Sequence, residues 1–242
     1  MARLGPFDLN EAPCVVGSVV TRGGLVRLLS ERSAPCDIVE LRLDQLCVEG
    51  VDWVSACRTL HDAGLTQLVT LRHAEEGGVW RLEESSRLGI LEPVLDVIEA
   101  ADVEIRQPDA MEVIEAVHEA GGIVIGSFHD FETTPSFEAL TDIVRQGLTA
   151  DFDVVKIAVC TEQEEDLAVL ERLLHACNHV PLAVLGMGRL GTESRVSLAT
   201  HGSCLTYGFL DEAAAPGQIY AGDLKVKLSE AHPVYRKVIG HW

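Results

Sequence analysis

The sequence predicts a closed (β/α)8 barrel, the TIM-barrel architecture, formed by a single domain over residues 1–242. Short apolar runs alternate with longer amphipathic runs from one end of the chain to the other. The length of 242 residues suits one barrel, and no linker or low-complexity segment divides the chain. An open doubly wound sheet is the alternative, but no Gly-x-Gly-x-x-Gly follows the first predicted strand.

Eight runs have the length and β-branched content of buried strands. They cover residues 14–20, 37–43, 67–71, 103–106, 123–128, 154–159, 182–185 and 204–209. The runs between them predict helices, for example at 25–33, 53–63, 111–120, 137–147 and 164–177. The last of these is the clearest, because its leucines fall on one stripe and its charged residues lie opposite.

The composition excludes several classes of partner and compartment. The net charge is −19 and the pI about 4.7, which argues against nucleic acid or an anionic membrane surface as a partner. The seven cysteines are odd in number and form no Cys-x-x-Cys, so neither a disulfide framework nor a zinc site is predicted. The N-terminus has no apolar signal core, and no segment is long enough to span a bilayer. We expect a cytoplasmic protein.

Lys156 lies within Val154-Val155-Lys156-Ile157-Ala158-Val159, an otherwise apolar predicted strand. Burial disfavours a charged ammonium and lowers the pKa of a lysine toward neutrality. A neutral amine is a nucleophile that forms Schiff bases with carbonyl compounds. The alternative is a lysine whose stem is buried while its charge reaches water. This segment by itself leaves the two interpretations evenly balanced.

Other polar residues follow the predicted strands. Side chains two residues apart on a strand share a face, which pairs Glu40 with Arg42, Thr70 with Arg72 and Ser127 with His129. Arg195 follows the seventh strand. These residues lie at the carboxyl ends of their strands, where barrel enzymes place their active sites.

Each residue also has a structural interpretation, which is the more common one for an isolated pair or a lone histidine. Glu40 and Arg42 could form a salt bridge, His129 could be a hydrogen-bonded core histidine, and Arg72 could pair with Glu76. Their convergence favours a site instead. It predicts a locally cationic mouth for a small anionic substrate, with arginines for a carboxylate and a histidine to move protons.

Two segments with glycine lie near the same end of the barrel. Residues 186–195 predict a turn that enters a helix carrying Arg195. Residues 213–218, Ala-Ala-Ala-Pro-Gly-Gln, follow the eighth strand and predict a mobile loop that closes over a substrate. An ordinary surface turn is the alternative for the second segment.

Six motifs in this order resemble type I 3-dehydroquinate dehydratase, the Schiff-base class, from about Val15 to Leu228. They are Glu40-Leu41-Arg42-Leu43-Asp44; Thr70-Leu71-Arg72 with Glu75-Glu76-Gly77-Gly78; Ser127-Phe128-His129-Asp130-Phe131 with Thr134-Pro135; residues 153–158 around Lys156; residues 187–195; and Ala215-Pro216-Gly217-Gln218. Each motif by itself has low specificity for the family, but all six in this order are highly specific.

The resemblance implies a lyase of the shikimate pathway, which leads to the aromatic amino acids. Lys156 would form an imine with the C3 ketone of 3-dehydroquinate, His129 would be the general acid and base, and Glu76 would orient His129. The remaining roles would be in substrate binding: Glu40 and Arg72 at the ring hydroxyls, Arg195 and Gln218 at the carboxylate, Arg42 in the polar shell and Met187 against the ring. The resemblance implies a homodimer that needs no metal or organic cofactor.

The chain departs from the family pattern in three places. Ala214 stands where a substrate-holding serine is usual, Cys160-Thr161 replaces Met-Pro, and the segment before Val15 is short for the usual N-terminal hairpin. Three rival functions follow from the residues. The first is another Schiff-base lyase, such as a class I aldolase. The second is a non-catalytic barrel that binds a shikimate-like acid, and Ala214 is the only residue that favours it. The third is a metal-dependent hydrolase that uses His73, His129 and Asp130.

Overall fold

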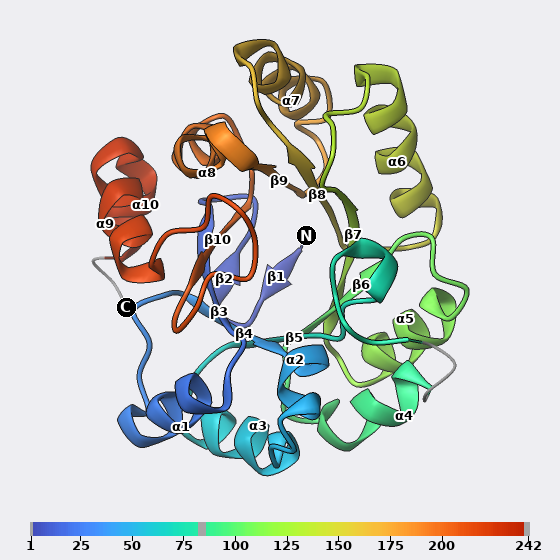
Figure 1. Cartoon of the computed structure of the whole chain (residues 1–242), viewed down its shortest axis with the longest axis vertical. Coiled ribbons are helices and arrows are strands. Elements are labelled where there is room, and N and C mark those ends of the chain that lie inside the picture. Colours follow the sequence, from blue (N-terminus) through green and yellow to red (C-terminus); the bar gives the residue numbers. More distant parts are fainter. Residues whose placement is uncertain (1, 82–85, 240–242) are drawn as a thin grey trace.

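In the computed structural model, which describes residues 2–81 and 86–239, eight parallel strands surround a common axis and helices ring them on the outside (Figure 1). The strands are β3 (Cys14–Val19), β4 (Ile38–Arg42), β5 (Gln67–Thr70), β6 (Ala100–Glu104), β7 (Ile123–Asp130), β8 (Val154–Cys160), β9 (Leu182–Met187) and β10 (Leu205–Phe209). Neighbours in sequence are neighbours in the sheet, and β10 pairs with β3. The predicted (β/α)8 TIM barrel is confirmed.

The two ends of the sheet, β9 and β10, meet through the residues just before β10. The Cys204 N–H donates to the Leu182 carbonyl at 2.7 Å, and the Ser203 hydroxyl accepts from the Val184 N–H at 2.8 Å. These bonds bring β10 beside β9, so the barrel is nearly closed.

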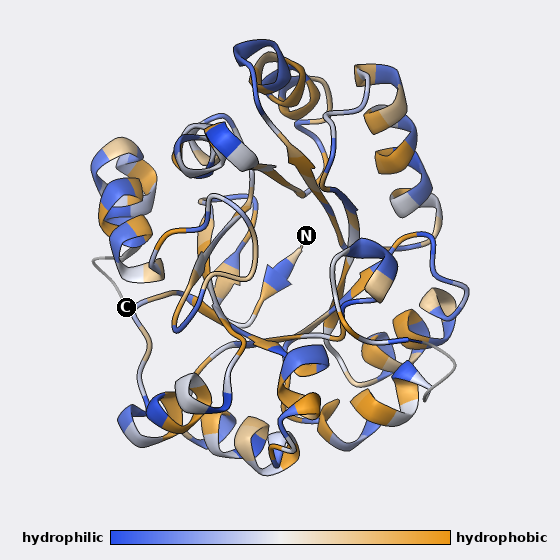
Figure 2. Cartoon of the chain, in the orientation of Figure 1, coloured by the Kyte–Doolittle hydropathy of each residue, from blue (hydrophilic) through white to orange (hydrophobic). Residues whose placement is uncertain are grey.

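The helices cover the outer face of the barrel. They are α1 (Arg22–Glu31), α2 (Leu43–Val48), α3 (Trp53–Asp62), α4 (Arg87–Leu91), α5 (Ala110–Glu119), α6 (Phe137–Thr149), α7 (Glu164–Ala176), α8 (Gly191–Thr200), α9 (Ala221–Ala231) and α10 (Pro233–Ile239), with 3₁₀ turns η1 (Ala74–Glu76), η2 (Glu92–Val94) and η3 (Gly188–Leu190). On α5, α6 and α7 the apolar side faces the strands and the polar side faces outward (Figure 2). The leucine stripe of α7 is buried, as its spacing predicts.

Strand β6 differs from its predicted range of 103–106, since it runs from Ala100 to Glu104. Asp102 and Glu104 interrupt the apolar pattern of this segment, yet they are 1% and 0% exposed. Charged residues enter a strand interior only when partners elsewhere compensate them, and sequence periodicity cannot reveal those partners.

A short hairpin covers the amino-terminal end of the barrel. Its strands are β1 (Arg3–Leu4) and β2 (Phe7–Asp8), and they cross the barrel opening in Figure 1. Leu4 is fully buried and packs in a cluster with Val16, Ile38 and Leu68 from the interior of the barrel. The hairpin closes this end, so the pocket described below opens at the other one. In the described part of the chain, no helix has the length and apolarity needed to cross a bilayer.

Candidate active site

A pocket opens at the carboxyl ends of the strands. Every residue that the sequence predicts for the site lines it: Glu40, Arg42, Arg72, Glu76, His129, Lys156, Met187, Arg195, Ala214 and Gln218. Tyr207 and Phe131 also line it, and neither was predicted as a site residue. The barrel therefore brings together residues that are spread over most of the sequence.

Lys156 is buried in the middle of β8, as predicted, with 5% of its surface exposed. Its Nζ lies 2.9 Å from Oδ2 of Asp102 and 4.2 Å from the centre of the Tyr207 ring. Burial opposes the charge on Asp102, but Arg72 and Lys156 outweigh it and hold the pKa of this carboxyl below its usual value. Asp102 is therefore a poor base and serves to hold the amine in place.

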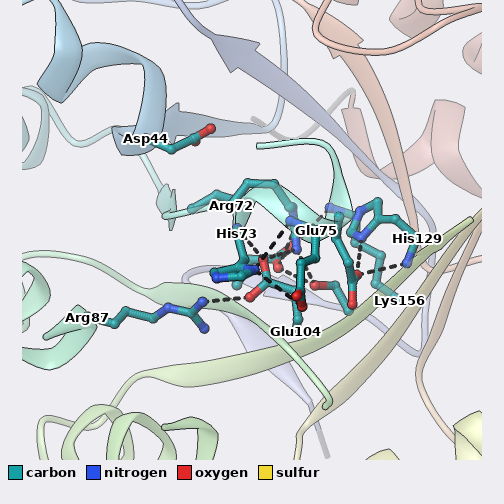
Figure 3. A network of polar contacts seen from close by, with 12 residues as sticks. Asp44, Arg72, His73, Glu75, Arg87, Glu104, His129 and Lys156 are labelled. Carbon is teal, nitrogen blue, oxygen red and sulfur yellow. Dashed lines mark hydrogen bonds and ion pairs between the residues drawn. The ribbon is translucent and has the colours of Figure 1, made fainter. Parts of the chain in front are cut away.

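Arg72 connects this pair to a second buried carboxylate. Its guanidinium donates to Asp102 at 2.8 Å, to Glu104 at 2.8 Å and to the Ser127 hydroxyl at 2.6 Å. Glu104 also accepts from Arg87 of α4 at 2.6 Å. The contacts of Arg87, Glu104, Arg72, Asp102 and Lys156 form one buried ion series. Figure 3 shows Arg87 at one end, Arg72 in the middle, and Lys156 at the other end beside His129. The suggested pairing of Arg72 with Glu76 is wrong, because these two carboxylates take its donors.

Sequence reasoning missed Asp102 and Glu104. Their one signal is the alternation in Ala101-Asp102-Val103-Glu104, which places both carboxylates on the same face of β6. That face points into the barrel, where it meets Arg72 from the segment after β5 and Lys156 from β8.

The buried carboxylates predict a loss of stability in acid. The folded-state pKa values of Asp102 and Glu104 lie below their usual 3.8 and 4.5. Each group therefore adds stability that is fully present above its unfolded pKa and is lost as the pH falls toward the lower folded pKa. Urea unfolding at several pH values should show the free energy of unfolding falling below about pH 4.5.

The variant Asp102→Asn tests the source of that slope. We expect it to lower the free energy of unfolding at pH 7 by about 3 kcal/mol and to flatten its acid dependence. Asp96→Asn is the matched control, because Asp96 pairs with Arg58 at the surface, where ion pairs contribute little. An equal flattening in the control would contradict the assignment to the barrel interior.

His129 lies on β7, beside β8, and its ring contacts Glu76 from η1. The Glu76 Oε2 atom is 2.9 Å from His129 Nδ1 and accepts from the His129 backbone N–H at 2.9 Å. This contact assigns the proton to Nδ1 and leaves the Nε2 lone pair available as a base. The Phe131 ring stacks on the imidazole, with the ring centres 6.3 Å apart.

Charge is disfavoured on both members of this pair. Burial, together with Arg72 and Lys156, lowers the pKa of His129 well below 6.5. Burial likewise raises the pKa of Glu76 to about 7. The imidazole is therefore held neutral at neutral pH, which is the form that can take a proton.

A glycine fixes the turn that carries Glu76. A Cβ on Gly78 would lie 1.9 Å from the Arg72 carbonyl oxygen, so no larger residue fits there. The Arg72 carbonyl accepts from the Trp80 N–H at 3.3 Å, and the turn folds back against the end of β5. Glu76 reaches His129 because this turn is tight.

Glu40 and Arg42 do not form the salt bridge considered above. Glu40 accepts from the hydroxyls of Ser18 and Thr70, the latter at 2.7 Å. Arg42 instead donates twice to Asp44, with both distances 2.9 Å. Asp44 is buried and fixes Arg42 at the rim of the pocket, with its guanidinium already paired.

Arg195 has a different environment. It is 2% exposed and donates to the backbone carbonyls of Gly217 at 3.0 Å and Tyr207 at 2.9 Å. No carboxylate pairs with it among residues 2–81 and 86–239. Burial lowers its pKa to about 10, so it stays charged at neutral pH. A buried cation beside a pocket, without a counter-ion, suits an anionic ligand.

The loop after β10 packs against the start of α8. The Thr192 hydroxyl donates to the Gly217 carbonyl at 3.1 Å, and Gly217 has φ 78°, which favours glycine. The Gln218 side-chain oxygen accepts from the backbone N–H groups of Ala214 at 2.6 Å and Ala215 at 3.2 Å. Gln218 therefore holds the loop in its folded shape at the edge of the pocket.

The expectation of a locally cationic mouth is wrong. Asp44, Asp102 and Glu104 pair with Arg42, Arg72 and Lys156, so these three cations are balanced. The positive charge without a carboxylate partner is concentrated at Arg195, as described above. In the described residues, His73, His129 and Asp130 belong to no cluster with the spacing of metal ligands, and Asp130 instead accepts from Glu132 and Thr133 in a turn.

Known proteins identify this barrel. The family model described as type I 3-dehydroquinase matches residues 14–233. The chain belongs to the type I 3-dehydroquinase family. It is similar to the 3-dehydroquinate dehydratase of Methanococcoides burtonii, with 31% identity over 93% of this chain and 97% of that protein. It is also similar to the Methanosarcina acetivorans protein of the same description, with 33% identity over 93% and 97% of the two chains.

Solved structures agree with the family. The 3-dehydroquinate dehydratase of Aquifex aeolicus superposes with a TM-score of 0.77 and 27% identity, covering 90% of this chain and 98% of that one. The type I enzyme of Clostridium difficile, solved with covalently modified comenic acid, has the same fold, with a TM-score of 0.83 over 96% and 97% of the chains at 24% identity. The type I 3-dehydroquinase family places the chain among the lyases, as a type I 3-dehydroquinate dehydratase.

Proposed function

We propose that the chain dehydrates 3-dehydroquinate to 3-dehydroshikimate through an imine on Lys156, with His129 as general acid and base. The observation that carries the proposal is a buried lysine on β8 beside a histidine on β7 that is held by Glu76, with Arg195 lining the same pocket. An amine, a proton carrier and an anion-binding cation are the groups that this reaction needs.

The steps follow from the positions of these groups. The Lys156 amine, once it has lost a proton, adds to the C3 carbonyl, and His129 passes protons so that the carbinolamine loses water. The resulting iminium withdraws electrons and acidifies the C2 proton. His129 Nε2 takes that proton to form an enamine and then gives a proton to the C1 hydroxyl, which leaves as water. Hydrolysis of the imine releases 3-dehydroshikimate and restores Lys156.

The other pocket residues would position the substrate. Arg195 would bind the carboxylate, with Gln218 holding the loop beside it. Glu40 and Arg72 would face the ring hydroxyls, Arg42 would complete the polar rim, and Met187 would pack against the ring. Glu76 would keep His129 in its active orientation, and Asp102 would keep the Lys156 amine in reach of the ketone.

Borohydride trapping tests the imine. The protein is incubated with 3-dehydroquinate, reduced and weighed intact, and the modified residue is then mapped by peptide mass spectrometry. The chain has four lysines, Lys156, Lys225, Lys227 and Lys237, so mapping separates the barrel lysine from the three in the carboxyl-terminal segment. We expect one adduct, on Lys156. Turnover without any adduct would exclude the imine mechanism.

Ala214→Ser tests the departure in the loop. Ala214 is half-buried at the pocket edge and its N–H is held by Gln218, so a serine hydroxyl there would face the substrate. One added hydrogen bond contributes about 1 kcal/mol, and we expect KM to fall by about fivefold. Steady-state kinetics measure this, and an unchanged or higher KM would mean that the loop is built around alanine.

The remaining expectations belong to the same proposal: a single catalytic domain in a cytoplasmic homodimer. Analytical ultracentrifugation tests the assembly directly, with a sedimenting mass of twice 26.2 kDa expected. A species of 26.2 kDa at micromolar concentration would overturn the dimer.

A further inference from the structure

Tyr207 lies in the same pocket, and none of the roles above uses its hydroxyl. It comes from the middle of β10 and is 3% exposed. Its side chain packs in the interior cluster with Ala158, Leu185 and Met187, which also line the pocket. Tyr207 therefore forms part of the wall against which a substrate ring would lie.

The position of Tyr207 places it between the two groups that would bind opposite parts of the substrate. The Lys156 Nζ lies 4.2 Å from the centre of its ring. Its backbone carbonyl accepts from the Arg195 guanidinium at 2.9 Å. All three residues line the same pocket, so a ligand held by the amine and the arginine would lie beside Tyr207.

The hydroxyl of Tyr207 is buried and has no hydrogen-bond partner among residues 2–81 and 86–239. A buried hydroxyl left without a partner destabilises the fold, and phenylalanine would fill the same space without that cost. Burial and the charges of Glu40 and Asp102 raise the pKa of this phenol well above 10. The group is therefore a neutral hydroxyl, able to donate and to accept one hydrogen bond or more.

We propose that the Tyr207 hydroxyl positions the substrate by a hydrogen bond to a ring hydroxyl of bound 3-dehydroquinate, at C4 or C5. This rests on the proposed function. The carboxylate is assigned to Arg195, so the partner is another part of the ligand. A ring hydroxyl can donate to the Glu40 carboxylate and accept from Tyr207, whereas an anionic group would be repelled by Glu40. Tyr207 on the barrel wall thus offers the substrate a hydroxyl, whereas Ala214 in the loop, where a serine is usual in the family, offers none.

Tyr207→Phe tests the proposal, because it removes one oxygen and keeps the ring beside Lys156. We expect KM for 3-dehydroquinate to rise about fivefold, with a smaller change in kcat, and Tm to stay the same or rise. Borohydride trapping at saturating substrate should still modify Lys156. Loss of the imine mechanism is thereby distinguished from loss of this contact, since only the first would abolish the adduct.

Two deoxy analogues of the substrate, lacking the C4 or the C5 hydroxyl, sharpen the test. Tyr207→Phe should weaken binding of one analogue by the same factor as the parent and leave the other unchanged, which identifies the contacted hydroxyl. Equal weakening of both analogues, or an unchanged KM for the parent, would overturn the proposal.

Tyr235→Phe is the matched control. Tyr235 is also buried, but its hydroxyl donates to Asp37 at 2.7 Å at the other end of the barrel. Its removal should lower Tm and leave KM unchanged, which is the pattern of a structural tyrosine. A Tyr207→Phe protein with that same pattern would place Tyr207 in the structural class and refute the proposal.

Discussion

Lys156→Ala should lower kcat by about 10⁴-fold or more and abolish borohydride trapping altogether. Without the amine no iminium forms, so the C2 proton keeps its ordinary low acidity and His129 has nothing to act on. Removing an essential nucleophile costs far more than removing a binding contact. The rate is measured from the absorbance of the conjugated product, with substrate affinity measured separately by calorimetry.

The substitution also leaves Asp102 without one of its two cations, so its effect on folding must be separated from its effect on chemistry. Arg72 still pairs with Asp102 at 2.8 Å, and we expect the barrel to stay folded at pH 7. Lys225→Ala is the matched control, because Lys225 also pairs with a carboxylate, Asp37, but outside the pocket. A Lys156→Ala protein that turns over within tenfold of the unsubstituted enzyme would refute the imine.

His129→Asn should lower kcat by about 10³-fold. Asparagine can still donate to Glu76, but it places no basic nitrogen where Nε2 lies, so the C2 proton and the leaving hydroxyl lose their carrier. Because Lys156 is intact, long incubation with substrate and borohydride should still give an adduct. This outcome distinguishes the two residues: the lysine is needed for the covalent step and the histidine for proton transfer.

His118 supplies a matched control. It is held by Asp153 at 2.8 Å, much as His129 is held by Glu76, but the pair lies outside the pocket. His118→Asn should leave kcat unchanged. If both histidine variants lost activity equally, the effect would come from the loss of a histidine–carboxylate pair in the barrel and not from proton transfer at the pocket.

The pH dependence of kcat/KM should reflect the environment of His129. Burial and the positive charges of Arg72 and Lys156 lower its pKa below 6.5, so the neutral base persists as the pH falls through that value. We expect the acid limb of the profile in the free enzyme to lie below pH 6.5. An acid limb above pH 7 would mean that Glu76 keeps the imidazolium, and that the buried pair is charged.

The sequence predicted the barrel and the residues of the pocket because both depend on local patterns. Apolar runs of strand length indicate the barrel strands, and a polar residue at the carboxyl end of a strand indicates the mouth of the barrel. Lys156, His129 and Arg195 were found in this way, and the structure places all three at one pocket.

The pairing of the charges could not be predicted, because it depends on which side chains meet across the barrel. Arg72 lies 30 residues from Asp102 and 32 from Glu104 along the chain, and the pairing of β5 with β6 brings their atoms to 2.8 Å. The period of two along a strand places Glu40 and Arg42 on the same face. Arg42 nevertheless pairs with Asp44, which lies in the first turn of α2. The excess of positive charge inferred from the residues was therefore wrong. The residues themselves line one pocket, and their roles stay a prediction.

The buried ion series from Lys156 to Arg87 makes the Lys156 amine part of a unit larger than the pocket. An engineer who moved the lysine to another strand, to accept a different ketone, would leave the buried Asp102 with Arg72 as its one remaining ion-pair partner. A transfer of the lysine with its buried ion-pair partners would therefore have to include β5, β6, β8 and α4, and these four elements form one module. Libraries confined to the pocket rim would leave this module intact, whereas random mutagenesis should yield inactive clones with substitutions in α4, outside the substrate's reach.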